Sequence, residues 1–145
     1  MEVKAQKNFL EVLKMKRQKV KCHCGAQAFL RPESAVFGTK SRGGYLYVCS
    51  RYPTCDSYVS VHRRNKKPKG TLANAELRQK RIQAHKAFNV IWESGLMEKW
   101  QAYRWMQAIF GLNTQQAHIA KFSLYMCDEL IRRCEEFRQN NRIAS

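Results

Sequence analysis

Residues 21–25 read K-C-H-C-G and residues 47–56 read Y-V-C-S-R-Y-P-T-C-D, so the chain carries two pairs of closely spaced cysteines. The stretch between the pairs is long enough for one β-hairpin. Two close pairs separated in this way are typical of a tetrahedral thiolate zinc site, because each short pair brings two sulfur atoms to neighbouring coordination positions. The pattern predicts one structural zinc ion, bound by Cys22, Cys24, Cys49 and Cys55.

The ligand set has one open point, because the first pair is spaced Cys-x-Cys where Cys-x-x-Cys is commoner. His23 lies between the two thiols and His62 lies at the end of a predicted strand, and either imidazole can replace a sulfur ligand. A cluster of buried free cysteines is the alternative without a metal. Four protein ligands leave no open coordination position for water or substrate, so a closed site serves folding and not catalysis.

Strand and turn patterns surround the cysteines. Residues 26–31, 45–49 and 58–62 are short apolar or aromatic runs, and S-R-G-G at residues 41–44 is a turn signal. Gly25 suits a tight turn after the first pair, and Pro53 restricts the backbone of the second. These patterns predict a small β zinc ribbon over residues 20–62.

The segment from Cys49 to Cys55, with C-H-C-G upstream, resembles the zinc ribbons at the C-terminal end of bacterial type I topoisomerases. The chain from about residue 20 to 135, which continues through P-K-G-T-L-A-N at residues 68–74, is similar to a family of small phage and prophage proteins described as zinc-finger-containing. The resemblance implies a zinc site and a phage origin. It implies no particular activity.

The rest of the chain reads as helix. Residues 1–19 carry an apolar stripe among lysines, which predicts an amphipathic N-terminal helix. Residues 63–72 are rich in Lys and Arg, contain Pro and Gly and have no large apolar side chain before Leu72. This composition predicts a basic linker. Residues 73–140 are predicted to form three to four helices. The fold class is therefore predicted as α+β, with the ribbon first and the helical half after it.

Within the helical half, glycines and polar caps set the predicted ends. The first helix is expected to run from a cap at Thr71 or Asn74 to Gly95, and the second is expected to stop at Gly111. Ser123 is expected to cap the last helix. A helix-turn-helix over this last region is a weaker alternative, because the last helix starts with L-Y-M at residues 124–126 rather than with base-reading polar residues.

The chain is strongly basic. It has 27 Lys and Arg against 11 Asp and Glu, a net charge of +16. Such an excess is typical of a protein that meets phosphate backbones or an acidic protein surface. The tyrosines at positions 45, 47, 52 and 58 are candidates for stacking on bases. The candidate residues for binding nucleic acid or a partner are Arg42, Arg51, Arg63, Arg64, Lys66, Lys67, Lys69, Arg78 and Arg81.

Two functions fit these features, and neither is an enzyme, since no recognisable catalytic motif is present. The first is a zinc-stabilised binding protein that engages nucleic acid or a nucleic-acid-processing complex. The alternative is a phage anti-defence inhibitor that binds a host CRISPR effector nuclease and blocks its DNA binding. No apolar stretch is long enough to cross a membrane and no secretory signal is visible, so we expect a location in the bacterial cytoplasm. The oligomeric state stays open.

Overall fold

The computed structural model describes residues 19–142, so the helix predicted over residues 1–19 lies outside the described part except for its last residue. The chain forms two compact units that divide between Asn74 and Ala75. We call residues 19–74 the sheet unit and residues 75–142 the helical unit. A small antiparallel sheet followed by helices confirms the predicted α+β class.

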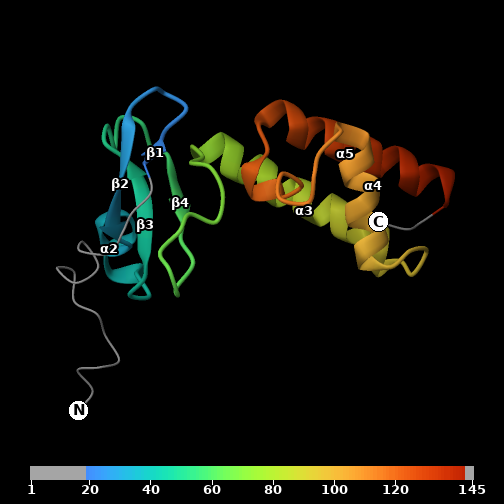
Figure 1. Ribbon diagram of the computed structural model, residues 1–145, viewed down its shortest axis with the longest axis horizontal. Helices are drawn as coiled ribbons and strands as arrows, with labels where there is room; N and C mark the ends of the chain where they lie inside the picture. Colours follow the sequence, from blue (N-terminus) through green and yellow to red (C-terminus); the bar gives the residue numbers. More distant parts are fainter. Residues whose placement is uncertain (1–18, 143–145) are drawn as a thin grey trace, which may run out of the picture. The chain divides into compact units, whose positions relative to one another are not determined.

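The sheet unit is a four-stranded antiparallel meander in which each strand pairs with the next along the chain (Figure 1). Ala28 lies opposite Cys49, and Tyr47 lies opposite Val59. The sequence missed only the first strand, whose two residues are too few to show an alternating pattern. The strands are β1 (Val20–Lys21), β2 (Gln27–Pro32), β3 (Tyr45–Cys49) and β4 (Tyr58–Ser60).

The two faces of this sheet are covered differently. Along β2, Ala28 and Leu30 are buried while Phe29 and Arg31 are exposed, as expected for a half-buried strand. The buried face packs into a core that includes Tyr47, Cys49, Val59 and Leu72. The other face carries a short helix, α2 (Ser34–Phe37), followed by a 3-10 turn, η2 (Gly38–Lys40). The ring of Phe37 meets that of Tyr58 edge-on, with centroids 5.6 Å apart.

The segment predicted as a basic linker is folded onto the sheet unit. His62 N donates to Lys67 O at 2.8 Å and Lys66 N donates to His62 O at 2.9 Å, which closes a tight turn. Lys69 N then donates to Ser60 O at 2.9 Å, and Leu72 is fully buried. We call residues 62–69 the basic hairpin. Backbone hydrogen bonds stabilise the basic hairpin. Because every residue type can form them, the sequence composition did not reveal them and predicted a linker.

The helical unit contains α3 (Ala75–Glu93), α4 (Lys99–Phe110), the 3-10 turn η3 (Ile119–Lys121) and α5 (Leu124–Asn140). Gly111 ends α4 in the left-handed region, with φ 65° and its N–H bonded to Gln107 O. Ser123 Oγ accepts a hydrogen bond from Met126 N at 3.2 Å and caps α5. The predicted stop and cap are therefore confirmed. Residues 114–121 form turns and η3, so the first helix of a helix-turn-helix is not formed there.

The core of the helical unit is built from its own side chains. Helices α3 and α5 lie side by side (Figure 1). Edge-to-face ring pairs join α4 to its neighbours: Phe88 with Tyr103 at 5.0 Å and Phe110 with Phe122 at 5.3 Å. Cys127 and Cys134 are buried free thiols, as expected for small core residues. Within residues 19–142, no helix is long and apolar enough to cross a membrane.

Candidate metal centre

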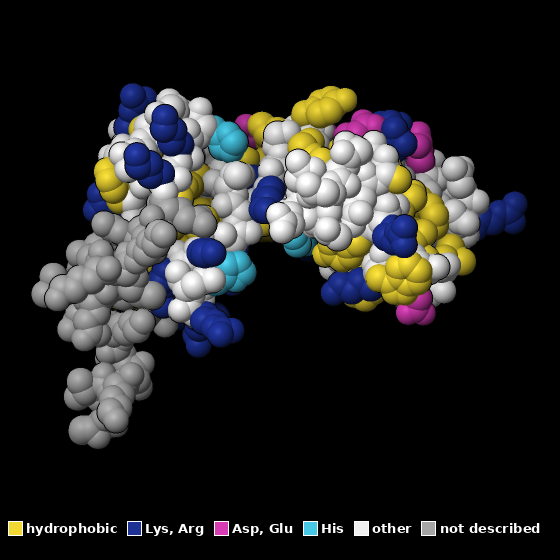
Figure 2. Space-filling model, viewed as in Figure 1, with side chains coloured by type: hydrophobic (Ala, Val, Ile, Leu, Met, Phe, Trp, Pro, Cys, Tyr) yellow, Lys and Arg dark blue, Asp and Glu magenta, His cyan; other side chains and the backbone are white. Residues whose placement is uncertain are grey.

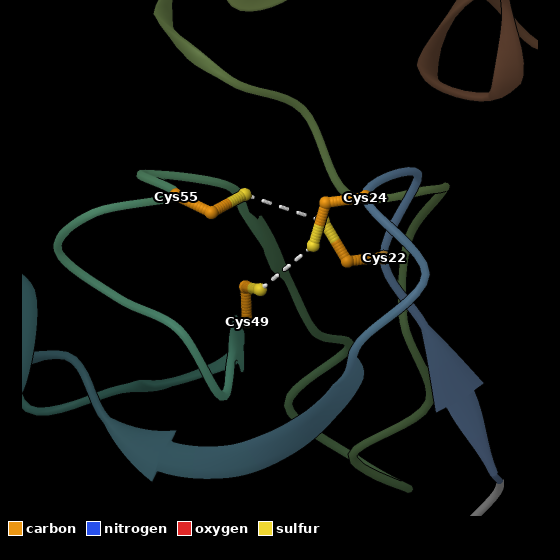
Figure 3. A group of neighbouring side chains, drawn as sticks. All are labelled: Cys22, Cys24, Cys49 and Cys55. Atoms are coloured by element: carbon orange, nitrogen blue, oxygen red, sulfur yellow. Dashed lines mark hydrogen bonds between the residues drawn. The ribbon is translucent and has the colours of Figure 1, made fainter.

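The four cysteines of the two pairs meet at one end of the sheet unit. The Sγ atoms of Cys22 and Cys55 lie 3.6 Å apart, and those of Cys24 and Cys49 lie 3.5 Å apart (Figure 3). All four sulfur atoms lie within 4.8 Å of one another. A disulfide would require about 2.05 Å between sulfurs, so the four side chains are free thiols that face a common centre.

These distances fit a tetrahedral zinc site. With Zn–S bonds of about 2.3 Å, the edge of the coordination tetrahedron is about 3.8 Å, close to both short sulfur pairs. Among the described residues 19–142, the side chains placed so that they could hold a metal ion are these four cysteines. His23 and His62 are exposed and do not belong to this group. The prediction of one structural zinc ion is confirmed, and four thiolates close its coordination sphere.

The first cysteine pair lies in the turn between β1 and β2. Gly25 N donates to Cys22 O at 3.0 Å, and Cys22 N donates to Ala26 O at 2.8 Å. Gly25 has a φ of 95°, a conformation that favours glycine. This turn brings both thiols of a Cys-x-Cys pair toward the centre, so the shorter spacing is compatible with the site.

In the second pair, Cys49 ends β3 and Cys55 lies on the loop that follows. Arg51 N donates to Cys49 Sγ at 3.4 Å, and Tyr52 N donates to Cys49 O at 3.0 Å. Cys55 N donates to Arg51 O at 3.1 Å and returns the chain to the cluster. The amide that points at Cys49 stabilises negative charge on the sulfur, as a zinc-bound thiolate requires.

The environment separates the pKa values of the thiols. Burial raises the pKa of Cys49 to about 12, so this thiol holds its proton at neutral pH when no metal is bound. The hydroxyl of Ser57, 3.4 Å from Cys55 Sγ, and then the Ser57 backbone lower the pKa of Cys55 to about 7. Zinc must displace protons to bind, so its affinity falls as the pH falls. Sequence analysis missed Ser57, because a serine two residues after a cysteine is no recognised signal.

The predicted binding residues divide into two groups. On the sheet unit, Arg42, Arg51, Arg63, Arg64, Lys67 and Lys69 are exposed. Lys66 is half-buried and helps to form the hairpin: its Nζ donates to Arg63 O at 2.6 Å and lies 5.6 Å from the centroid of the Tyr45 ring. Tyr47 is only 2% exposed and belongs to the core, so it cannot stack on a base.

Arg78 and Arg81 belong to the helical unit, and Arg81 does not lie on its surface. Arg81 is 8% exposed, and its Nε and Nη2 both donate to Phe122 O at 3.0 and 2.9 Å. Its position follows from helical periodicity, since Leu77, Ala84 and Phe88 are buried along the same face of α3. The charge of Arg81 suggested a surface role, but the side chain instead bonds to a backbone carbonyl inside the unit.

Comparison with curated proteins found no match, and comparison with solved structures found none. A family described as a zinc-finger-containing domain matches residues 17–137, which cover both units and all four cysteines of the cluster. The match extends well beyond the metal centre, so the helical unit is part of the same family domain. The chain therefore belongs to the zinc-finger-containing domain family.

Proposed function

We propose that this protein is a non-enzymatic, zinc-stabilised binding protein whose sheet unit engages the phosphate backbone of nucleic acid. The charge of the sheet unit supports the proposal. Between residues 19 and 74 the sequence has eleven Lys and Arg, whereas its acidic residues there are Glu33 and Asp56. A surface of this composition attracts polyanions and releases their counterions on binding.

The sheet unit has two acidic side chains, and Glu33 is hydrogen-bonded within a loop. Glu33 Oε1 accepts hydrogen bonds from Arg42 N at 3.0 Å and from Ser41 Oγ at 3.5 Å, so it serves the loop before β3. Asp56 is half-buried. In Figure 2, dark blue Lys and Arg side chains are spread over the sheet unit, whereas most of the magenta acidic side chains in view lie on the helical unit.

The basic hairpin is the strongest candidate for phosphate contacts. Arg63, Arg64 and Lys67 are exposed and form no ion pair with any described residue of the chain. The acids of the helical unit behave differently: Asp128 pairs with Lys80 at 2.7 Å, and Glu129 pairs with neighbouring arginines. Cations without an internal ion pair, on a hydrogen-bonded turn, can contact phosphates without first breaking such a pair.

The closed zinc site supports a binding role without catalysis. Four thiolates around one zinc ion leave no position for a water molecule or a substrate. The metal then contributes folding energy to a unit that is too small to be stable on its apolar core alone.

Charge reversal on the hairpin tests the proposal. We expect the triple variant Arg63→Glu, Arg64→Glu, Lys67→Glu to bind a labelled oligonucleotide at least about tenfold more weakly, with a shallower dependence of log K on log salt concentration. Fluorescence anisotropy over a salt series measures both quantities. The matched control reverses three exposed charges of the helical unit, Lys86→Glu, Arg104→Glu and Arg142→Glu, and changes the net charge equally.

Equal losses of affinity in the two variants would mean that only net charge matters, and unchanged affinity in the hairpin variant would contradict the proposal.

The alternative function, inhibition of a host effector nuclease, predicts a different result. It requires a protein complex that is captured on the zinc-loaded chain and survives both nuclease treatment and high salt, together with only weak binding to bare nucleic acid.

A further inference from the structure

A hollow of about 150 Å³ opens on the sheet unit between α2 and the second cysteine loop. Arg31 of β2, Ala35 of α2, Val48 and Cys49 of β3, and Tyr52 of the loop line it. A cavity of about 150 Å³ accommodates one benzene molecule, so this hollow is large enough for one six-membered ring. A pyrimidine base has one such ring, whereas a purine base has a second ring fused to it.

The walls of the hollow suit a base. Ala35 is apolar and exposed, the half-buried Tyr52 adds an aromatic residue to the lining, and Val48, which is only 1% exposed, is a buried member of it. Arg31 adds a planar guanidinium with several N–H donors, which can bond to the carbonyl oxygens of a base or to an adjacent phosphate. Proteins that bind single-stranded nucleic acid combine aromatic side chains, on which bases stack, with basic side chains that contact the phosphates. The lining of this hollow has both kinds of side chain.

The surface beside the hollow has the same character. Phe29 is 41% exposed and lies opposite Val48 in the β2–β3 register, two residues before Arg31. Phe37 of α2 is 37% exposed. Phe29 and Arg31 lie on the same face of β2, because side chains two residues apart on a strand share a face. Stacking on such rings is available to unpaired bases and is closed to bases already paired and stacked in a duplex.

The metal centre fixes one wall of the hollow. Cys49 lines the hollow and is also a zinc ligand, and Tyr52 lies on the loop that runs from Cys49 to Cys55. Hydrogen bonds from Tyr52 N to Cys49 O and from Cys55 N to Arg51 O close this loop. Zinc therefore orders the aromatic wall, and a site that needs Tyr52 depends on the metal.

We propose that this hollow binds one unpaired pyrimidine base, so that the protein prefers single-stranded nucleic acid to duplex. The inference rests on the proposed function, in which the basic hairpin supplies phosphate contacts, and it adds a contact to a base. Phosphate contacts alone give similar affinities for single strands that carry or lack bases. A base site makes these affinities differ.

The test compares three ligands and three proteins by fluorescence anisotropy at one salt concentration. The ligands are an oligothymidylate, its duplex with oligoadenylate, and a strand of the same length with abasic sites in place of the bases. The proteins are the wild type, Ala35→Phe, which fills the hollow without changing charge, and Ser34→Phe, a matched control on the same helix outside the hollow lining. Zinc content and circular dichroism verify that each variant folds.

We expect the wild type to bind oligothymidylate about tenfold more tightly than the duplex or the abasic strand, the size of one stacking contact. Ala35→Phe should lose this preference and keep its affinity for the abasic strand, and Ser34→Phe should behave as the wild type. Equal wild-type affinity for all three ligands overturns the base site but leaves phosphate binding intact. Absence of binding to every ligand overturns the proposed function as well.

Discussion

At the scale of single residues, Cys49 joins the metal centre to the sheet. It ends β3, is 1% exposed, pairs with Ala28 across the strands and accepts an N–H···S hydrogen bond from Arg51. Burial raises the pKa of its thiol to about 12, so only a bound cation makes its thiolate favourable at neutral pH. Replacing the proton by zinc therefore turns a core thiol into a cross-link between β3 and the β1–β2 turn.

We expect Cys49→Ser to lose the single zinc equivalent and to unfold the sheet unit. A serine hydroxyl is a poor zinc ligand at neutral pH, and zinc binding contributes about 10–16 kcal/mol in small zinc-finger peptides. This contribution is as large as the whole net stability of a typical domain, about 5–15 kcal/mol. Zinc released on denaturation, measured with a chromophoric chelator, gives the metal content per chain.

Cys134→Ser is the matched control. Cys134 is also buried, at 2% exposure, but lies in α5 of the helical unit and outside the cluster. This variant should keep one zinc per chain and lose stability only in the helical unit, where a hydroxyl replaces a buried thiol. A Cys49→Ser protein that retains both its zinc and its melting temperature would refute the ligand assignment.

The sequence predicted the residues whose roles are local and missed those whose roles depend on distant partners. Paired cysteines show their chemistry through spacing alone, so four ligands were predictable. Arg81 looked like a surface cation, and the acceptor that holds it, Phe122 O, lies 41 positions away in the chain. Arg31 was missed for a similar reason, because its hollow forms only when β2, β3, α2 and the cysteine loop come together.

At the scale of elements, length separates what was predictable from what was not. The strands β2 and β3 and the helices α3, α4 and α5 are long enough to show a period of two or of 3.6 residues. The strand β1 and the helix α2 span two and four residues, too few for any period. The basic hairpin, residues 62–69, has no alternating apolar pattern, so neither its internal turn nor its hydrogen bond from Lys69 N to Ser60 O of β4 was predictable.

Helix α5 carries a chain of ion pairs one turn apart. Arg132 bonds to Glu129 at 2.6 Å and to Glu136 at 2.8 Å, and Arg133 bonds to Glu129 at 2.9 Å. Arg138 bonds to Glu135 further along the helix. Such pairs at i,i+3 and i,i+4 support a helix, and Glu129 and Arg132 each have two charged partners in the first group.

The stability that Glu129 gives to α5 should depend on pH. Hydrogen bonds from Arg132, then from Arg133, lower its pKa from 4.5 to about 2. The folded state therefore binds this proton less readily than the unfolded state, and the stabilisation is complete above about pH 4.5 and lost as the pH falls toward 2. We expect Glu129→Gln to be less stable than wild type at pH 7, with a difference that disappears toward pH 2.

Urea unfolding followed by tryptophan fluorescence measures this difference in the helical unit, because Trp92, Trp100 and Trp105 all lie there. Acid release of zinc from the sheet unit then does not enter the signal. Glu136→Gln serves as the control, since Glu136 bonds to Arg132 through one oxygen and its replacement should matter less. A stability difference that stays constant from pH 7 to pH 2 would rule out the charge of Glu129 as its origin.

At the scale of the whole molecule, the two units rely on different sources of stability. The sheet unit has a small apolar core, a metal cross-link and a large excess of positive charge, which repels itself. The helical unit has three long helices, ring pairs between them and ion pairs on α5. Metal dependence should therefore be confined to the sheet unit, which also carries the basic hairpin and the base-sized hollow.

Chelation of zinc in the full chain tests this division of stability. We expect a strong chelator to remove the zinc, to expose the sheet unit to trypsin and to abolish oligonucleotide binding. Tryptophan emission and the helical signal in circular dichroism should change little, because all three tryptophans and the long helices belong to the helical unit. Added zinc should restore the sheet unit, since the loss is a binding equilibrium. If tryptophan emission shifts to that of an unfolded chain as zinc leaves, the helical unit does not fold independently and the metal supports the whole molecule.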